Sequence, residues 1–169
     1  MRSACYRPKR FDNDRWCGMT SSEADFPTNL RLSLDTAPSA EVRGALGHAI
    51  DAFHALTVPR DQRRFALLLH DEAARLAAGV CFVLAWQWMF VEALWVGDAW
   101  RGKGIGAALL SRAEQQAAAA GCHSVWLDTF QARDFYLRFG YQPFGTLEDY
   151  PPGQTRHFLR KRLLPESTE

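Results

Sequence analysis

Arg101-Gly102-Lys103-Gly104-Ile105-Gly106 is the stretch that decides the fold of this chain. It follows an apolar run that ends at Val96 and precedes a stretch rich in Ala and Leu, which is typical of a helix. Glycines let backbone N–H groups crowd around an anion, and a helix N-terminus adds about half a positive charge. The stretch therefore predicts a strand, a loop and a helix that together bind a phosphate or pyrophosphate group; the alternative is a glycine-rich turn without a ligand.

Two other phosphate-binding patterns overlap this loop. Residues 97–103 fit the start of a Walker A loop, but Gly104 stands where a Ser or Thr hydroxyl must reach Mg²⁺. Gly102-x-Gly104-x-x-Ala107 fits a dinucleotide fingerprint, and Asp128 stands about 20 residues further on, where a ribose-binding acid belongs. The strands before the loop, however, read as an antiparallel meander and not as an opening parallel unit. A dinucleotide-binding oxidoreductase is therefore only a remote alternative.

Length and composition set broad limits on function. A chain of 169 residues suits one domain, and a formal net charge of +1 provides no field for nucleic acid. The four cysteines show no paired spacing, which favours reduced thiols and a cytoplasmic protein. The five histidines are scattered without ligand spacing, so we expect no metal. We expect neither nucleic acid nor a membrane as a partner.

The two ends of the chain read as tails. Residues 1–28 carry five basic residues among the first 15 and no apolar run, so we expect a disordered N-terminal segment and no secretory signal. Met19 is an alternative start. We place the domain at residues 29–164 and a short C-terminal tail at 165–169.

Hydrophobic periodicity predicts the order strand, helix, three strands, helix, strand, helix, two strands. The apolar stretch 76–96 is long enough for a membrane helix of about 20 residues, but Glu92 and the many Val, Phe and Trp residues favour a hairpin with its turn near residues 86–88. The apolar stripe of the first helix is expected to lie in the core. The other elements are expected at residues 30–34, 38–53, 65–69, 104–120, 124–127, 132–139, 144–147 and 157–164.

Three segments together resemble one family. The loop Arg101 to Gly106 is similar to the R/Q-x-x-G-x-G/A signature of the GNAT (Gcn5-related) N-acetyltransferases. Residues 90–96 resemble the family's fourth strand, and FYLRFGY at 135–141 resembles its FYEKxGF-type helix end. The similarity covers about residues 30–164. Residues 131–163 are most similar to a bacterial branch whose tails read QAxxFYExxGYxxFGxLxDYPPGHSRxFLRKxL.

This resemblance implies a fold and a co-substrate. The implied fold class is α/β (α+β), a single GNAT-like domain with a mixed, mostly antiparallel sheet of six to seven strands flanked by helices. Its fourth and fifth strands splay apart to hold acetyl-CoA as co-substrate. The residues implied in CoA binding are Leu94, Trp95, Val96, Arg101, Gly102, Lys103, Gly104, Ile105, Gly106, Ala107 and Gln131.

The resemblance also implies a reaction, in which a primary amine attacks the thioester directly within a ternary complex. Tyr136 would protonate the departing thiolate, its alternative role being ring packing under a helix. Glu92 would activate the amine, unless it only pairs with an Arg or faces solvent, and Asp128 is the reserve candidate. Glu148, Asp149 and Tyr150 are substrate-binding candidates or a solvated turn.

The acceptor stays open at this point: a small-molecule amine, or an amine of a peptide or protein. A homodimer is also open. The alternative from a different class is a non-catalytic domain that binds acyl-CoA as a sensor or assembly module.

Overall fold

The structure is a computed structural model that describes residues 26, 27 and 29–163. The chain divides into two compact units, residues 1–46 and 47–169. Almost all of the predicted N-terminal tail, and the C-terminal tail at 165–169, lie outside the described residues.

The first unit differs from two expectations. The strand predicted at residues 30–34 is wrong: this segment is irregular and its three leucines are exposed. A strand needs a hydrogen-bonded neighbour, and the described part of this unit supplies none. Helix α1 (Ala40–His54) forms as predicted and continues into the second unit, but none of its residues is buried. The stripe expected in the core is exposed at Val42, Leu46, Ile50 and Phe53.

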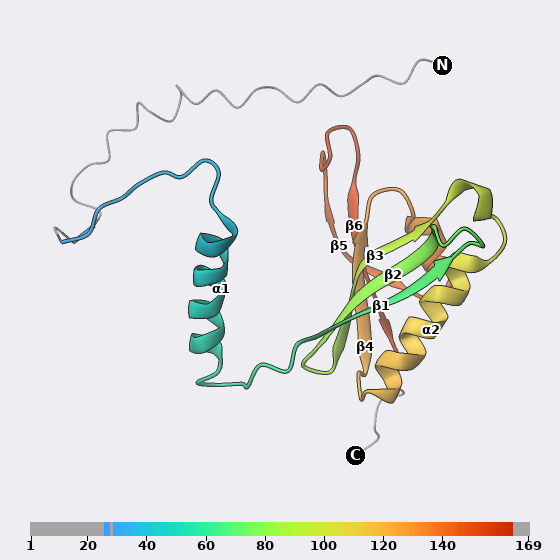
Figure 1. Cartoon of the computed structure of the whole chain (residues 1–169), viewed down its shortest axis with the longest axis horizontal. Coiled ribbons are helices and arrows are strands. Elements are labelled where there is room, and N and C mark those ends of the chain that lie inside the picture. The colour runs from blue at the N-terminus through green and yellow to red at the C-terminus, as the bar shows by residue number, and fades with distance from the viewer. Residues whose placement is uncertain (1–25, 28, 164–169) are drawn as a thin grey trace. The chain divides into compact units, whose positions relative to one another are not determined.

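The second unit is built on one six-stranded sheet in the order β1-β2-β3-β4-β6-β5 (Figure 1). Only the β3–β4 pair is parallel, and the other four pairs are antiparallel. The predicted fold class is thereby confirmed, with six strands. The strands are β1 (Arg63–His70), β2 (Leu76–Ala85), β3 (Trp88–Val96), β4 (Ser124–Thr129), β5 (Gln142–Leu147) and β6 (Arg156–Arg162).

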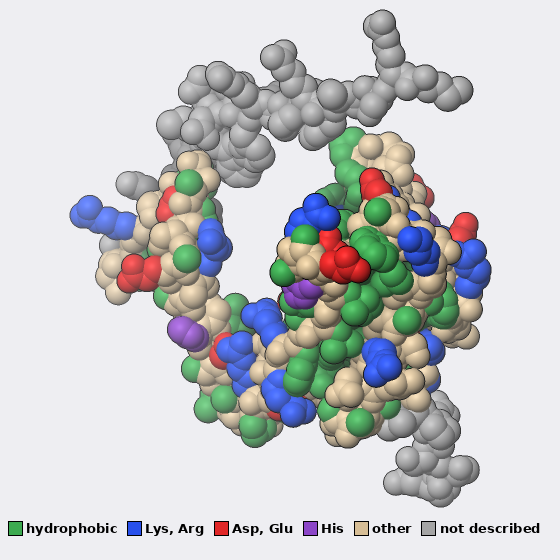
Figure 2. Space-filling view, turned by 45° about the vertical axis from the view of Figure 1, so that its right-hand side comes forward, with side chains coloured by type: hydrophobic (Ala, Val, Ile, Leu, Met, Phe, Trp, Pro, Cys, Tyr) green, Lys and Arg blue, Asp and Glu red, His purple; other side chains and the backbone are tan. Residues whose placement is uncertain are grey.

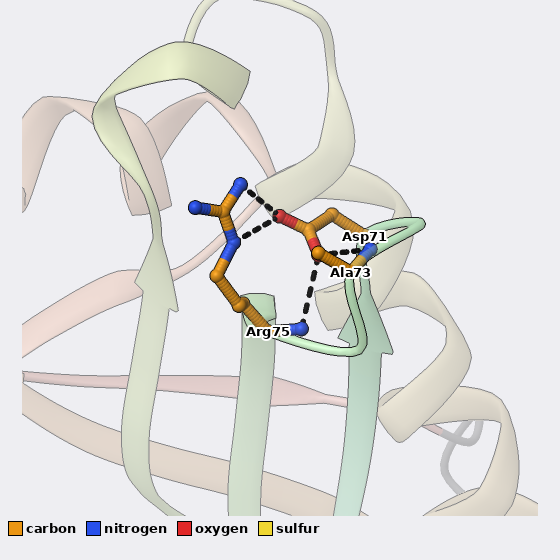
Figure 3. A network of polar contacts seen from close by, with 3 residues as sticks. All are labelled: Asp71, Ala73 and Arg75. Carbon is orange, nitrogen blue, oxygen red and sulfur yellow. Dashed lines mark hydrogen bonds and ion pairs between the residues drawn. The ribbon is translucent and has the colours of Figure 1, made fainter.

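A small polar network closes the turn between β1 and β2. One carboxylate oxygen of Asp71 accepts hydrogen bonds from the backbone N–H groups of Ala73 and Arg75, and the other accepts one from the Arg75 side chain (Figure 3). The hydrogen bonds from Arg75, backbone first and side chain second, lower the pKa of the Asp71 carboxyl. The Asp71 carboxylate is therefore charged in the turn that joins the first two strands of the meander.

The hairpin predicted within residues 76–96 is confirmed. Its two turn residues, Trp86 and Gln87, both have positive φ, at 48° and 62°, which matches the right-handed twist of the flanking strands. Further along, Cys81 pairs with Ala93 but Phe82 pairs with Val91. Glu92 is therefore the extra residue of a β-bulge, which bends β3 just where the strand must leave its neighbour.

Helix α2 (Ile105–Ala119) packs on one face of the sheet and completes the core of this unit. Leu110, Ala113 and Ala117 of the helix belong to the same buried hydrophobic cluster as Val80 and Phe82 of β2. Hydrophobic side chains also gather on the surface that is turned to the viewer in Figure 2. On the edge strand β1, Phe65, Leu68 and Leu69 are exposed in the described part of the chain.

Helix α3 (Arg133–Arg138) joins the core through a polar tie as well as through aromatic contacts. The Tyr141 hydroxyl, just after α3, donates to Glu114 of α2 at 2.9 Å, and Lys161 of β6 donates to the same carboxylate at 2.6 Å. The ring centroids of Tyr136 and Tyr141 lie 5.4 Å apart. Three elements that are distant in sequence are thus tied together beside Tyr136.

These two buried tyrosines predict a loss of stability in alkali. Burial, followed by nearby negative charge, raises the pKa of Tyr136 to about 12 from 10.0, and the pKa of Tyr141 is also raised. The folded state therefore keeps protons that the unfolded chain releases, so stability is fully present below pH 10 and falls as pH rises. The free energy of unfolding should fall by up to about 1.4 kcal/mol per pH unit for each tyrosine above pH 10. Urea unfolding of the wild type and of Tyr136→Phe from pH 9 to 11 measures this slope. The variant should show the smaller slope, and equal slopes for the two proteins would contradict the prediction.

Candidate active site

A gap opens in the sheet where β3 and β4 separate. The two strands pair only over Trp88 to Phe90 and Ser124 to Trp126, although β3 continues to Val96. Beyond the bulge at Glu92, the backbone edge of β3 that faces β4 has no strand partner among the described residues. Free N–H and C=O groups on such an edge can bind an extended ligand as a further strand would. The predicted splaying of these two strands is confirmed; they are the third and fourth of the structure because the first predicted strand does not form.

The glycine loop follows β3 through one 3-10 turn, η2 (Asp98–Trp100). Arg101 holds the loop to the strand end, since its Nε donates to the Val96 carbonyl at 3.0 Å and its Nη1 lies 2.9 Å from Asp98. Gly102 and Gly104 have positive φ, 75° and 78°, and the place of a Cβ is open space at both. The backbone of the loop is therefore open to contact with a ligand. The Arg101 side chain instead fixes the conformation of the loop.

The N-terminus of α2 is free to bind an anion. Gly104 is its N-cap, and no side chain in the described part of the chain caps the first turn. The first N–H group of this helix with a backbone partner in the helix is that of Ala108, which donates to the Gly104 carbonyl. The preceding amides and the positive end of the helix dipole therefore suit phosphate oxygens.

A cavity of about 580 Å³ lies between this loop, the end of β3 and helix α3. Gly106 belongs to its wall, and a Cβ there would touch Val96 and Phe135 at 3.5 and 3.7 Å. Eight of the predicted CoA-binding residues line the cavity. They are Leu94, Val96, Arg101, Gly102, Gly104, Ile105, Gly106 and Ala107. The cavity is also lined by six residues that were not predicted to bind CoA, which are Trp100, Ala132, Phe135, Tyr136, Arg138 and Phe139.

Three predicted CoA-binding residues do not line this cavity. The Trp95 side chain is 47% exposed and lies beside Gly97. The Lys103 ammonium lies over the Trp100 ring, 4.9 Å from its centroid. Gln131 lines a second cavity, of about 330 Å³, between β3 and β4. Leu94, Ala132 and Tyr136 line both cavities, so Tyr136 stands at their junction.

Comparison with known proteins agrees with this geometry. The model of the acetyltransferase (GNAT) family matches residues 31–141. The chain belongs to the GNAT family. It is an acyltransferase by this membership and by its relatives. It is 43% identical over 102 residues to a blasticidin-S acetyltransferase of Streptomyces morookaense, covering 59% of this chain and 75% of that protein.

Two solved structures resemble this GNAT chain. An acetyltransferase from Agrobacterium tumefaciens superposes with a TM-score of 0.75 at 28% identity, over 79% of this chain and 99% of the other. An aminoglycoside 6'-N-acetyltransferase complexed with coenzyme A superposes with a TM-score of 0.56 at 18% identity, over 62% and 76%. The second likeness supports the fold alone. In the described part of this chain, no helix has the length and apolarity to cross a membrane, and no three potential metal ligands of the His, Cys, Asp and Glu types lie together.

Tyr136 is buried and held by aromatic neighbours in this GNAT fold. Its ring lies 5.0 Å from that of Phe135 and 5.4 Å from that of Tyr141. Burial is the larger cause and the Asp128 charge the smaller cause of its raised pKa, about 12. The raised pKa keeps its hydroxyl protonated. No described residue makes a hydrogen bond to this hydroxyl, so it is available to a ligand.

The two acidic candidates both line the second cavity of the GNAT fold but differ in their partners. Glu92 is 35% exposed and lies 3.6 Å from the Nε of Arg64, which is itself 68% exposed. Such an exposed ion pair is weak, so Glu92 can exchange this partner for a ligand. Asp128 is less exposed, at 22%, and accepts a hydrogen bond from Arg156.

The three predicted substrate-binding residues do not line either cavity. Asp149, with a φ of 54°, closes its own loop by accepting a hydrogen bond from the N–H of Gly153 at 2.6 Å. Glu148 makes no hydrogen bond or ion pair with a described side chain of either cavity. Tyr150 reaches the second cavity indirectly, because its ring lies 4.6 Å from the guanidinium carbon of Arg156.

Sequence reasoning missed several residues of this GNAT site. Arg156 falls within the tail pattern of residues 131–163, but that pattern assigns it no role, and only the β4–β6 pairing brings it to Asp128. Arg138 places a cation at the first cavity, whereas the helical pattern of residues 132–139 assigns it no role. The aromatic wall of the first cavity had a weak signal in the sequence. Phe135 and Phe139, the second of which follows the last residue of α3, repeat at helical spacing.

Proposed function

We propose that this chain transfers the acetyl group of acetyl-CoA to a primary amine by direct attack within a ternary complex. The observation that carries the proposal is the junction of the two cavities at Tyr136. One cavity has the anion-binding loop and helix N-terminus that suit a pyrophosphate, and the other has the carboxylates that suit an amine. Tyr136 lies where the thioester and the amine would meet.

The proposed reaction moves the acetyl group from sulfur to nitrogen in one step. The amine nitrogen forms a bond to the acetyl carbonyl carbon, the carbon–sulfur bond breaks, and the electron pair leaves on sulfur. Glu92 takes a proton from the amine through water, and Tyr136 gives a proton to the thiolate. The buried surroundings that raise the pKa of Tyr136 would also raise the proton affinity of a thiolate beside it. Tyr136 is reprotonated from solvent after the thiol leaves.

The relatives suggest which acceptors to try first. The 43% identical relative is a blasticidin-S acetyltransferase, so we propose a small-molecule amine ahead of a protein lysine. The second cavity, about 330 Å³, suits a small group.

Thiol release tests the proposed function. The folded protein is mixed with acetyl-CoA and, separately, with blasticidin S, an aminoglycoside, a polyamine and a peptide with a free N-terminus. We expect amine-dependent release of free thiol and a product heavier by one acetyl group. Calorimetry that showed no CoA binding would contradict the proposal, and tight CoA binding without thiol release from any amine would favour a non-catalytic acyl-CoA sensor.

A further inference from the structure

An ion pair lies in the second cavity, and the proposed chemistry leaves it without a role. Asp128 is near the end of β4 and Arg156 is the first residue of β6, and the antiparallel pairing of these strands brings them together. The Nη1 of Arg156 donates to Oδ2 of Asp128. Both side chains are mostly buried, at 27% and 22% exposed, and both line the cavity beside Tyr136. An ion pair in this position is able to contact the amine acceptor.

The guanidinium of Arg156 is held in place by aromatic rings. Its central carbon lies 4.6 Å from the centroid of the Tyr150 ring and 5.7 Å from that of Phe130. Contacts of this kind restrict an arginine without using its N–H groups. The planar group therefore keeps its hydrogen-bond donors for other partners.

Each member of the pair has hydrogen-bonding capacity to spare. The Nε of Arg156 is buried and has no hydrogen-bond partner among the described residues. Asp128 uses Oδ2 for Arg156, and no described residue donates to Oδ1. A buried donor without a partner is costly, and an oxygen atom from a ligand relieves that cost. The cavity therefore offers Oδ1 of Asp128 as a hydrogen-bond acceptor beside the Nε–H group of Arg156 as a donor.

We propose that Asp128 and Arg156 select an acceptor whose primary amine is accompanied by a carbonyl or carboxylate oxygen, as in an amino acid or its amide. This inference rests on the proposed function and specifies its acceptor class. Asp128 accepts a hydrogen bond from the amine, and Arg156 donates to the oxygen. The Arg156 charge also disfavours an acceptor that has a second cation in place of that oxygen.

Two matched amines test this selection. β-Alaninamide carries a carbonyl oxygen, whereas butylamine has the same chain length without it. We expect the CoA-saturated protein to bind β-alaninamide about tenfold or more tightly, because a hydrogen bond from a charged donor is lost with butylamine. Saturation-transfer NMR measures binding, and thiol release measures kcat/KM for the same two amines.

Variants assign the preference to particular atoms. Arg156→Met should bring the affinity for β-alaninamide down to that for butylamine, while Asp128→Asn should weaken both amines by a similar factor and keep their ratio. Arg160→Met is the matched control. Arg160 lies on the same strand and over the Phe144 ring, but it does not line this cavity, so its loss should leave the ratio unchanged. If Arg156→Met does not fold, Tyr150→Leu takes its place in the test. This variant loosens Arg156 without removing it and should lower the ratio of the two affinities.

The outcomes separate this inference from the proposed function. Equal binding of the two amines by the wild type, or a preference that survives in Arg156→Met, would overturn the selection even if both amines release thiol. Selective binding of β-alaninamide without thiol release would support the selection and contradict the transferase proposal.

Discussion

Gly104→Val is expected to weaken acetyl-CoA binding by about 100-fold or more, because charge-assisted hydrogen bonds to phosphate are lost together. Gly104 has a φ of 78°, and the space a Cβ would fill is open in the protein itself. That space is where the pyrophosphate is proposed to lie. A β-branched side chain would occupy it and would also pull the backbone away from the left-handed region. Calorimetry with acetyl-CoA measures the loss.

Gly121→Val is the control for backbone strain. Gly121 follows the other end of the same helix, has a φ of 87° and likewise has open space for a Cβ. Both variants should therefore lose a similar amount of stability, roughly 1–2 kcal/mol from the left-handed conformation. Only Gly104→Val should lose CoA affinity. If both variants bind acetyl-CoA like the wild type, the loop does not hold the pyrophosphate.

Tyr136→Phe is expected to lower the turnover number by about 10- to 100-fold, at the low end of the range for general acid catalysis or below it. The change removes one hydroxyl and little volume, and the remaining ring keeps its contacts with Phe135 and Tyr141. Acetyl-CoA affinity should therefore survive. Initial rates at saturating acetyl-CoA and amine measure the turnover number.

The pH dependence separates this acid from the base. Because the pKa of Tyr136 is about 12, its ionisation should not reduce the wild-type rate below about pH 11. The defect of Tyr136→Phe should stay flat or grow as pH rises. The defect of Glu92→Gln should shrink, since more of the amine is already neutral. Full turnover of Tyr136→Phe at every pH would mean that water or the substrate protonates the thiolate.

Several features of this fold could be predicted because their causes are local. The loop at Arg101 to Gly106 has glycines where positive φ is needed, and α2 has alanines and leucines up to a closing Gly121. The hairpin followed from the Val, Phe and Trp content of residues 76–96 and from the cost of Glu92 in a membrane. In each case neighbours in sequence decide the backbone.

Two expectations failed because their causes are not local. Residues 30–34 alternate like a strand, but a strand exists only with a hydrogen-bonded neighbour, and the described part of the chain does not supply one. The apolar stripe of α1 likewise needs an apolar surface to cover it, and periodicity cannot say whether one is present.

The sequence by itself determined the glycine loop, the helix behind it and the aromatic end of α3 with Tyr136, since each is a short segment with its own backbone preferences. Only the tertiary structure decided what meets in the gap between β3 and β4. The bulge at Glu92 depends on the register with β2, and the pairing of Asp128 with Arg156 depends on β4 and β6 lying side by side. Register and strand order are set by packing over the whole sheet, so no spacing in the sequence could reveal them.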